Sequence, residues 1–179
     1  FSMLAGPTGE VHAFEPVPET YDLLSDNTKH LSCNLKINNL AVGQTKGKTS
    51  ISYDLNDSEK ASLAYHIPSN TKKCEVDIIP LDDYVRENEM RRLDFVKCDV
   101  EGFELQALIG MKHTLRKYIP QLCIEVTLTQ KDRLSMLRFL KDSGYDSFRV
   151  VEKNYPTYYS SRHSSKDYFY LYAFSSKTA

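Results

Sequence analysis

The stretch LDFVKCDVEGFE, residues 93–104, joins a short apolar run to two carboxylates and a glycine. The apolar part, Leu93 to Cys98, predicts a buried strand. The residues Asp99-Val100-Glu101-Gly102 then lead into a helix expected from about Phe103 to Tyr118, which ends before Pro120. A strand that runs straight into a helix is the repeating unit of an α/β sheet, so this stretch indicates the fold class.

Similar units lie on both sides of this stretch. The apolar run Val11 to Phe14 predicts a strand closed by Glu15-Pro16, and Pro18 suits the first turn of the next helix. A later helix is expected to be capped by Thr129 and Asp132 and to stop at Gly144. The other expected elements are strands at 35–42, 49–53, 76–79, 122–126, 148–151 and 168–174, a short helix at 81–88, and polar loops at 56–60 and 68–73.

This order predicts one α/β domain over residues 1–179, built on a doubly wound, mainly parallel sheet with helices on both faces. Residues 48–79 are expected to form a strand-rich insertion. The last two strands have no helix between them and should pair antiparallel. The loop that joins them is rich in Tyr and Ser, and its residues Tyr155, Tyr158 and Tyr159 form either a lid over substrate or a surface hairpin.

Composition narrows the function classes. The 179 residues are 41% hydrophobic and 26% charged, with a formal net charge of −1 and no basic run, which argues against a general nucleic-acid binder. No apolar run approaches the roughly 20 residues of a membrane span, and we expect the protein in the cytoplasm. The cysteines show no CxxC spacing and the five histidines show no paired spacing, so no metal site is expected. Cys98 and Cys123 lie in apolar strands, where buried reduced thiols are expected.

Ligands of open parallel sheets bind at the carboxyl ends of the strands, so polar residues there are the candidates. Glu15 ends the first strand and either accepts the two hydroxyls of a ribose or is a solvated turn carboxylate. The segment Asn38 to Gly43 either flanks a flat adenine ring or is an ordinary strand exit. Glu125, at the end of a later strand, is a further cleft candidate, or else a buried carboxylate paired with Lys or Arg.

Asp99 and Glu101 indicate a functional site more strongly than the candidates above, because two carboxylates directly follow a predicted buried strand and begin a helix. Acidic residues in a first helical turn gain roughly 0.3–1 kcal/mol from the helix dipole, which would explain either residue alone. Together they are candidates for holding a cofactor's amino group, orienting a substrate or acting as general base. Lys97 and Asp94 alternate with apolar residues and are interpreted as strand-edge or face-switching residues, and the stripe Leu108, Met111 and Leu115 as core.

Taken together, these segments resemble the FkbM-type methyltransferases, a branch of the class I fold. The similarity rests on EVHAFEPVPET at 10–20, LAVG at 40–43, IPLDDY at 79–84, the stretch 93–104 quoted above, and the strand from Pro120 to Val126. Family members carry "V-x-A-F-E-P-x-P" in the first block and "K-x-D-V-E-G" in the fourth. The blocks follow one another in the family's order over about 115 residues, counted from Glu10 to Val126.

The resemblance implies methyl transfer from S-adenosylmethionine, commonly to oxygen. It places Glu15 on the cofactor's ribose, and Leu40 and Ala41 near its adenine. Asp99 and Glu101 would be the catalytic residues of the methyl-transfer cleft, with Asp99 also close to the cofactor. The implied partner is a small-molecule acceptor such as a sugar, a lipid headgroup, a polyketide-type hydroxyl or a small acid.

The family also carries a strand and a "D-x-G-A-x-x-G" loop, which are expected upstream of Phe1, with Phe1 to Ala5 as the tail of the following helix. We therefore expect residues 1–179 alone to bind S-adenosylmethionine poorly. Two other interpretations stay open at this point. One is a nicotinamide-dependent oxidoreductase, which shares the sheet and an acidic strand end, and the other is a catalytically inactive Rossmann-like domain that binds a partner.

Overall fold

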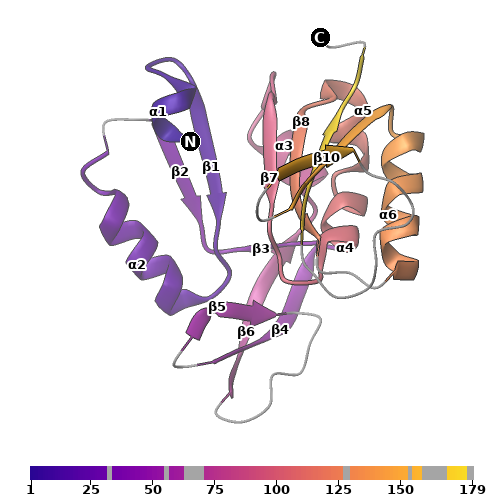
Figure 1. Ribbon diagram of the computed structural model, residues 1–179. Coiled ribbons are helices and arrows are strands. Elements are labelled where there is room, and N and C mark those ends of the chain that lie inside the picture. Colours follow the sequence, from indigo (N-terminus) through magenta and orange to yellow (C-terminus); the bar gives the residue numbers. More distant parts are fainter. Residues whose placement is uncertain are drawn as a thin grey trace.

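The computed structural model describes residues 1–31, 34–54, 57–62, 71–126, 130–152, 155–158 and 169–176 (Figure 1). The helices are α1 (Ser2–Ala5), α2 (Pro18–Thr28), α3 (Leu81–Glu87), α4 (Glu104–Ile109), α5 (Lys112–Tyr118) and α6 (Gln130–Asp142). The strands are β1 (Glu10–Phe14), β2 (Asn34–Asn38), β3 (Ala41–Val42), β4 (Gly47–Asp54), β5 (Asp57–Ser62), β6 (Thr71–Ile79), β7 (Phe95–Cys98), β8 (Gln121–Val126), β9 (Ser147–Glu152), β10 (Tyr155–Tyr158) and β11 (Phe169–Phe174).

The strands form three sheets, with orders β1-β2, β10-β9-β11-β8-β7 and β3-β6-β4-β5. Among the described strands the pairs β1–β2, β3–β6 and β7–β8 are parallel, and the other five pairs are antiparallel. The α/β class is confirmed, but the expected mainly parallel, doubly wound sheet is corrected to separate sheets, two of them mixed. The reason is that β4 to β6 and β9 to β11 follow one another without an intervening helix, which favours antiparallel pairing.

Figure 1 shows β1, β2 and α2 on one side of the molecule and the five-stranded sheet with α3 to α6 on the other, joined through β3. Within the described chain, β1 has β2 as its one strand partner and β7 has β8 as its one partner. Phe1 and Phe95 nevertheless place their rings 5.5 Å apart. The two sheets are therefore neighbours whose facing strands do not pair with each other.

The strand expected at 35–42 is two strands in different sheets. Asn38 donates its side-chain amide to the carbonyl of Ala13 at 2.9 Å, and Asn39 donates to the carbonyl of Glu15 at 2.8 Å. These side chains bind backbone groups of β1 and the turn after it, so the chain leaves β2 at this point. β3 then starts at Ala41 and pairs with β6.

The helix expected from 103 to 118 is also divided, into α4 and α5. A Cβ on Gly110 would lie 1.9 Å from the carbonyl oxygen of Gly43, so the chain between the helices touches the backbone after β3. Asp82 then accepts the backbone N–H groups of His113 at 3.0 Å and Thr114 at 2.7 Å, which starts α5 as a separate, capped helix.

The insertion is strand-rich as expected, although β5 occupies part of the predicted loop at 56–60. β9 and β11 pair antiparallel, which confirms that expectation, and β11 lies between β9 and β8. Tyr155 and Tyr158 belong to β10 rather than to a loop. Tyr159, Thr129 and Cys33 lie outside the described residues.

The larger core lies between the five-stranded sheet and helices α3 to α6. Leu108, Met111 and Leu115 are 0–2% exposed, so the predicted core stripe is confirmed. Cys98 and Cys123 are buried free thiols, as expected. A smaller core, around Val17, Ala41, Ile51, Tyr53, Val76 and Ile78, joins the start of α2 to the four-stranded sheet. In the described part of the chain no helix is long and apolar enough to cross a membrane.

Candidate functional site

A cluster of charged residues lies at the carboxyl ends of the adjacent parallel strands β7 and β8. Lys97 Nζ lies 2.5 Å from Asp99 Oδ2. Lys97 is level with Cys123 across the strand pair, and Glu125, two residues further along β8, projects from the same face as Cys123. Tyr170 of β11 lies opposite Glu125, and its ring centroid is 6.0 Å from Lys97 Nζ. Three neighbouring strands therefore place their polar side chains together.

Asp99 and Glu125 share a hydrogen bond, which lowers the pKa of Asp99 and raises the pKa of Glu125. The pKa of Glu125 is raised to about 7 by that hydrogen bond, by partial burial, and by the charges of Asp99 and Glu101. Burial would raise the pKa of Asp99 too, but hydrogen bonds from Glu125 and Lys97 outweigh burial and lower it. The pair thus holds a single proton, on Glu125, near neutral pH.

The backbone conformation of the turn after β7 determines the position of Glu101. Glu101 has φ 49° and Gly102 has φ 92°, so both residues adopt the left-handed region that glycine tolerates best. Glu104 is fully buried at the start of α4, and its Oε1 accepts the backbone N–H of Gly102 at 2.8 Å. Glu104 therefore supports the tight turn that carries Glu101 toward Glu125.

Glu15 stands just beyond the end of β1, in the other sheet. Its Oε1 accepts the backbone N–H of Val17 at 2.8 Å, and in the described chain its Oε2 has no hydrogen bond. Burial raises the pKa of this half-buried carboxyl group, although the bond from Val17 opposes the rise. The side chain is thus held by one oxygen, while the other can accept from a ligand hydroxyl.

The other two predicted cofactor residues lie between Glu15 and the four-stranded sheet. Leu40 is half-buried and packs against the larger core. Ala41 is 3% exposed and lies in the smaller core, so it offers a ligand little besides its backbone. An open cavity of about 440 Å³ does begin at Leu40, but it runs along β4 and β6, away from Asp99.

The structure thus brings together Asp99, Glu101 and Glu125 from the predicted set, while Glu15, Leu40 and Ala41 form a second group that extends from the turn after β1 to the start of β3. The sequence pattern predicts a strand-edge or face-switching position for Lys97 and gives no signal for Glu104. In the structure the Lys97 side chain is 37% exposed and pairs with Asp99. Among the described residues, no group of three or more His, Cys, Asp or Glu side chains could hold a metal ion.

The residues present fit an adenosyl sulfonium cofactor in two respects. At a strand end, Glu15 offers a carboxylate oxygen that has no hydrogen bond to a described residue, which suits a ribose hydroxyl. The carboxylates of Asp99 and Glu101 outnumber the ammonium group of Lys97, which suits a positively charged ligand.

Comparison with known proteins agrees with this geometry. The family model described as the methyltransferase FkbM domain matches residues 1–147. A hexuronic acid methyltransferase, AglP, of Haloferax volcanii is 32% identical over 106 residues, which are 59% of this chain and 43% of that protein. Methyltransferase sdnD of Sordaria araneosa is 26% identical over 176 residues, covering 80% of this chain and 67% of that protein.

A solved structure shows the same fold. The FkbM methyltransferase of Methylobacillus flagellatus superimposes with a TM-score of 0.59 over 92% of this chain and 36% of that one, at 18% identity. The chain therefore spans less than half the length of AglP and of this structure. With a family model matched over most of its length, the chain belongs to the FkbM methyltransferase family.

Proposed function

We propose that this chain forms one domain of an S-adenosylmethionine-dependent O-methyltransferase that acts on a small molecule with a free hydroxyl group. The observation that carries the proposal is the hydrogen-bonded pair Asp99–Glu125 at the ends of adjacent strands, within the part of the chain that the family model matches. The bound cofactor supplies an electrophilic methyl group. The chain must then bind that cofactor, orient the acceptor and receive the acceptor's proton.

We assign binding of the cofactor to the residues around Glu15 and Asp99. Glu15 Oε2 accepts from a ribose hydroxyl, and the segment at Leu40 and Ala41 borders the adenine. The carboxylates of Asp99 and Glu101 favour a cation through their charge, and a partly buried site makes this attraction stronger than it would be in water.

The acceptor class follows from the proton balance. A hydroxyl oxygen that gains a methyl group must lose its proton, whereas a carboxylate acceptor has none to lose. The Asp99–Glu125 pair can receive this proton once it is fully ionised, and a base with a pKa near 7 is well suited to act at neutral pH. The relative named for hexuronic acid methyl transfer supports an acceptor of the sugar type, which offers several hydroxyl groups.

The test is methyl transfer from labelled S-adenosylmethionine by the full-length protein, offered a panel of sugar acids, neutral sugars and lipid-linked sugars. Asp99→Asn should lower turnover at least ~100-fold, the usual range for loss of a general base. Asp94→Asn is the matched control, because Asp94 belongs to the same segment but forms an exposed ion pair with Arg92 at 2.7 Å. Equal turnover of the two variants would contradict the role of Asp99.

A further inference from the structure

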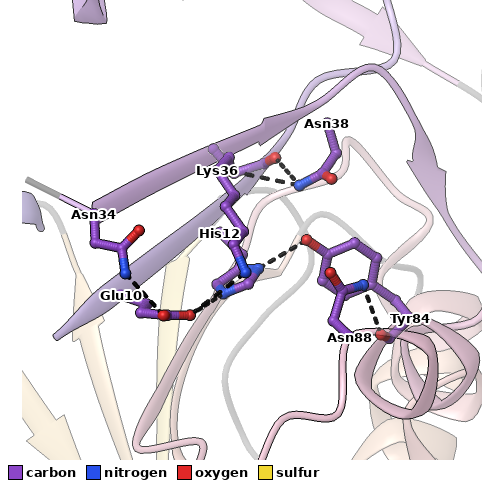
Figure 2. A network of polar contacts seen from close by, with 8 residues as sticks. Glu10, His12, Asn34, Lys36, Asn38, Tyr84 and Asn88 are labelled. Atoms are coloured by element: carbon purple, nitrogen blue, oxygen red, sulfur yellow. Dashed lines mark hydrogen bonds and ion pairs between the residues drawn. The ribbon is translucent and has the colours of Figure 1, made fainter.

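The segment Leu81–Tyr84 at the start of α3 has no part in the function proposed above, yet it contacts elements next to both halves of the candidate site, namely β1 and the start of α5. Tyr84 is 5% exposed, and its hydroxyl lies 2.7 Å from His12 Nδ1 on β1 (Figure 2). The Tyr84 ring also packs edge-on against Phe14, with ring centroids 4.8 Å apart. His12 and Phe14 project from one face of β1, and Glu15 is the next residue.

His12 continues the chain of contacts across β1 to β2. Its Nε2 lies 3.2 Å from Glu10 Oε2, and Glu10 Oε1 accepts the side-chain amide of Asn34 at 2.8 Å. Because a neutral imidazole carries one N–H, the hydrogen on Nε2 is donated to Glu10, and Nδ1 accepts the Tyr84 hydroxyl hydrogen. Figure 2 shows these side chains in one row from α3 to β2, joined by hydrogen bonds from Tyr84 through His12 and Glu10 to Asn34.

Two residues before Tyr84, Asp82 contacts the other half of the site. Its carboxylate accepts the first free N–H groups of α5, from His113 and Thr114, and its own backbone N–H donates to the carbonyl of Gly110 at 2.9 Å. α5 follows α4, and α4 begins directly after the turn of Asp99 and Glu101. One helical turn is therefore bonded to the strand that ends at Glu15 and to the helices that follow Asp99.

We propose that Tyr84 is a positioning residue, which holds the end of β1 against α3 and so sets where Glu15 stands relative to the Asp99 turn. The inference rests on the proposed function, since it assumes that Glu15 and Asp99 serve one bound cofactor. β1 makes this role necessary, because β2 is its one strand partner in the described chain. Among the described residues, Tyr84 joins the pair β1–β2 to α3 through its hydrogen bond to His12 and its ring contact with Phe14.

The test is calorimetric titration of S-adenosylhomocysteine into the full-length protein and its Tyr84→Phe variant. The substitution keeps the ring contact with Phe14 and removes the hydroxyl that bonds His12. Tyr118→Phe is the matched control, because it removes a hydroxyl that donates to the carbonyl of Met90 at 2.6 Å, away from β1. We expect Tyr84→Phe to weaken binding about 5- to 10-fold, the effect of losing a hydrogen bond of typical strength, and Tyr118→Phe less than 2-fold.

Amide hydrogen exchange of Glu10 to Phe14 gives a readout that does not depend on the cofactor. Tyr84→Phe should speed exchange there, and Tyr118→Phe should not. Wild-type binding with equal affinity and equal exchange in the two variants would overturn the positioning role. Absence of binding by the wild type, with faster exchange in Tyr84→Phe alone, would leave the contact in place as a structural tie and overturn the proposed function.

Discussion

Lys97 Nζ lies 2.5 Å from Asp99 Oδ2, and Asp99 is also hydrogen-bonded to Glu125. The ammonium group therefore favours the ionised form of Asp99 and leaves the shared proton on Glu125. This arrangement gives two neighbouring carboxyl groups different protonation states near neutral pH, which is a recurring way of assigning acid and base roles.

Lys97→Met should raise the pKa of Asp99, because it removes the cation and the hydrogen bond that favour the ionised carboxylate. The Asp99 titration should therefore move to higher pH. The measurement is a pH titration of the side-chain carboxyl carbons by NMR. Lys36→Met is the control, because Lys36 pairs with Glu10 at 3.7 Å on the other sheet. An unchanged Asp99 titration would contradict the pairing.

Glu125→Gln should change how stability depends on pH. The folded protein raises the pKa of Glu125 from 4.5 to about 7, so folding favours the protonated carboxyl group. That stabilising contribution is fully present below pH 4.5 and is lost as the pH rises through about 7. Glutamine cannot ionise, so the variant should lose less stability than the wild type between pH 5 and pH 8, by about 1 kcal/mol, since solvent screens a partly exposed group.

Urea unfolding of both proteins at pH 5 and pH 8 measures this difference. Glu75→Gln serves as the control, because Glu75 forms an exposed ion pair with Lys48. Identical pH dependence of wild type and Glu125→Gln would show that Glu125 titrates normally.

Gly110→Ala should destabilise the fold without touching the charged cluster. The added methyl group would lie 1.9 Å from the carbonyl oxygen of Gly43 and 2.8 Å from its carbonyl carbon, and backbone atoms cannot move aside as a side chain can. We expect a loss of about 2–3 kcal/mol in the free energy of unfolding, measured in urea. A loss below about 0.5 kcal/mol, the usual range for a substitution without a structural consequence, would argue against the close approach.

Glu15→Gln should weaken binding of S-adenosylhomocysteine to the full-length protein about tenfold, because a glutamine has one acceptor oxygen, and the NH2 group left in the position of Oε2 cannot accept a ribose hydroxyl hydrogen. The Oε1 bond from Val17 can be kept by the glutamine carbonyl oxygen, so the turn should hold its shape. Competition calorimetry measures the affinity, and unchanged affinity would remove Glu15 from the ribose site.

The local pattern of the sequence predicted the elements that depend on nearby residues. The strand that ends at Glu15, the helix that starts at Pro18 and the core stripe of Leu108, Met111 and Leu115 are all confirmed. Each is specified by apolar periodicity and by a proline within a few residues, so no distant contact is needed to define it.

The parts of the structure that differ from the sequence-based prediction depend on contacts between residues far apart in the chain. Gly43 and Gly110 are 67 positions apart, counted from their numbers in the chain, and their approach accompanies the break between α4 and α5. Asp82 caps α5 from another helix, which no periodicity in residues 103–118 indicates. The nearness of Lys97 to Glu125 likewise follows from the register of β7 and β8, which pairs Lys97 with Cys123.

Calorimetric titration of S-adenosylhomocysteine into the full-length protein, with residues 1–179 as a parallel sample, tests the central claim most directly. We predict micromolar binding by the full-length protein and much weaker binding by residues 1–179, because this chain spans only 43% of the length of AglP. Absence of binding by either sample would contradict the proposed cofactor and favour a domain that keeps the fold to bind another partner.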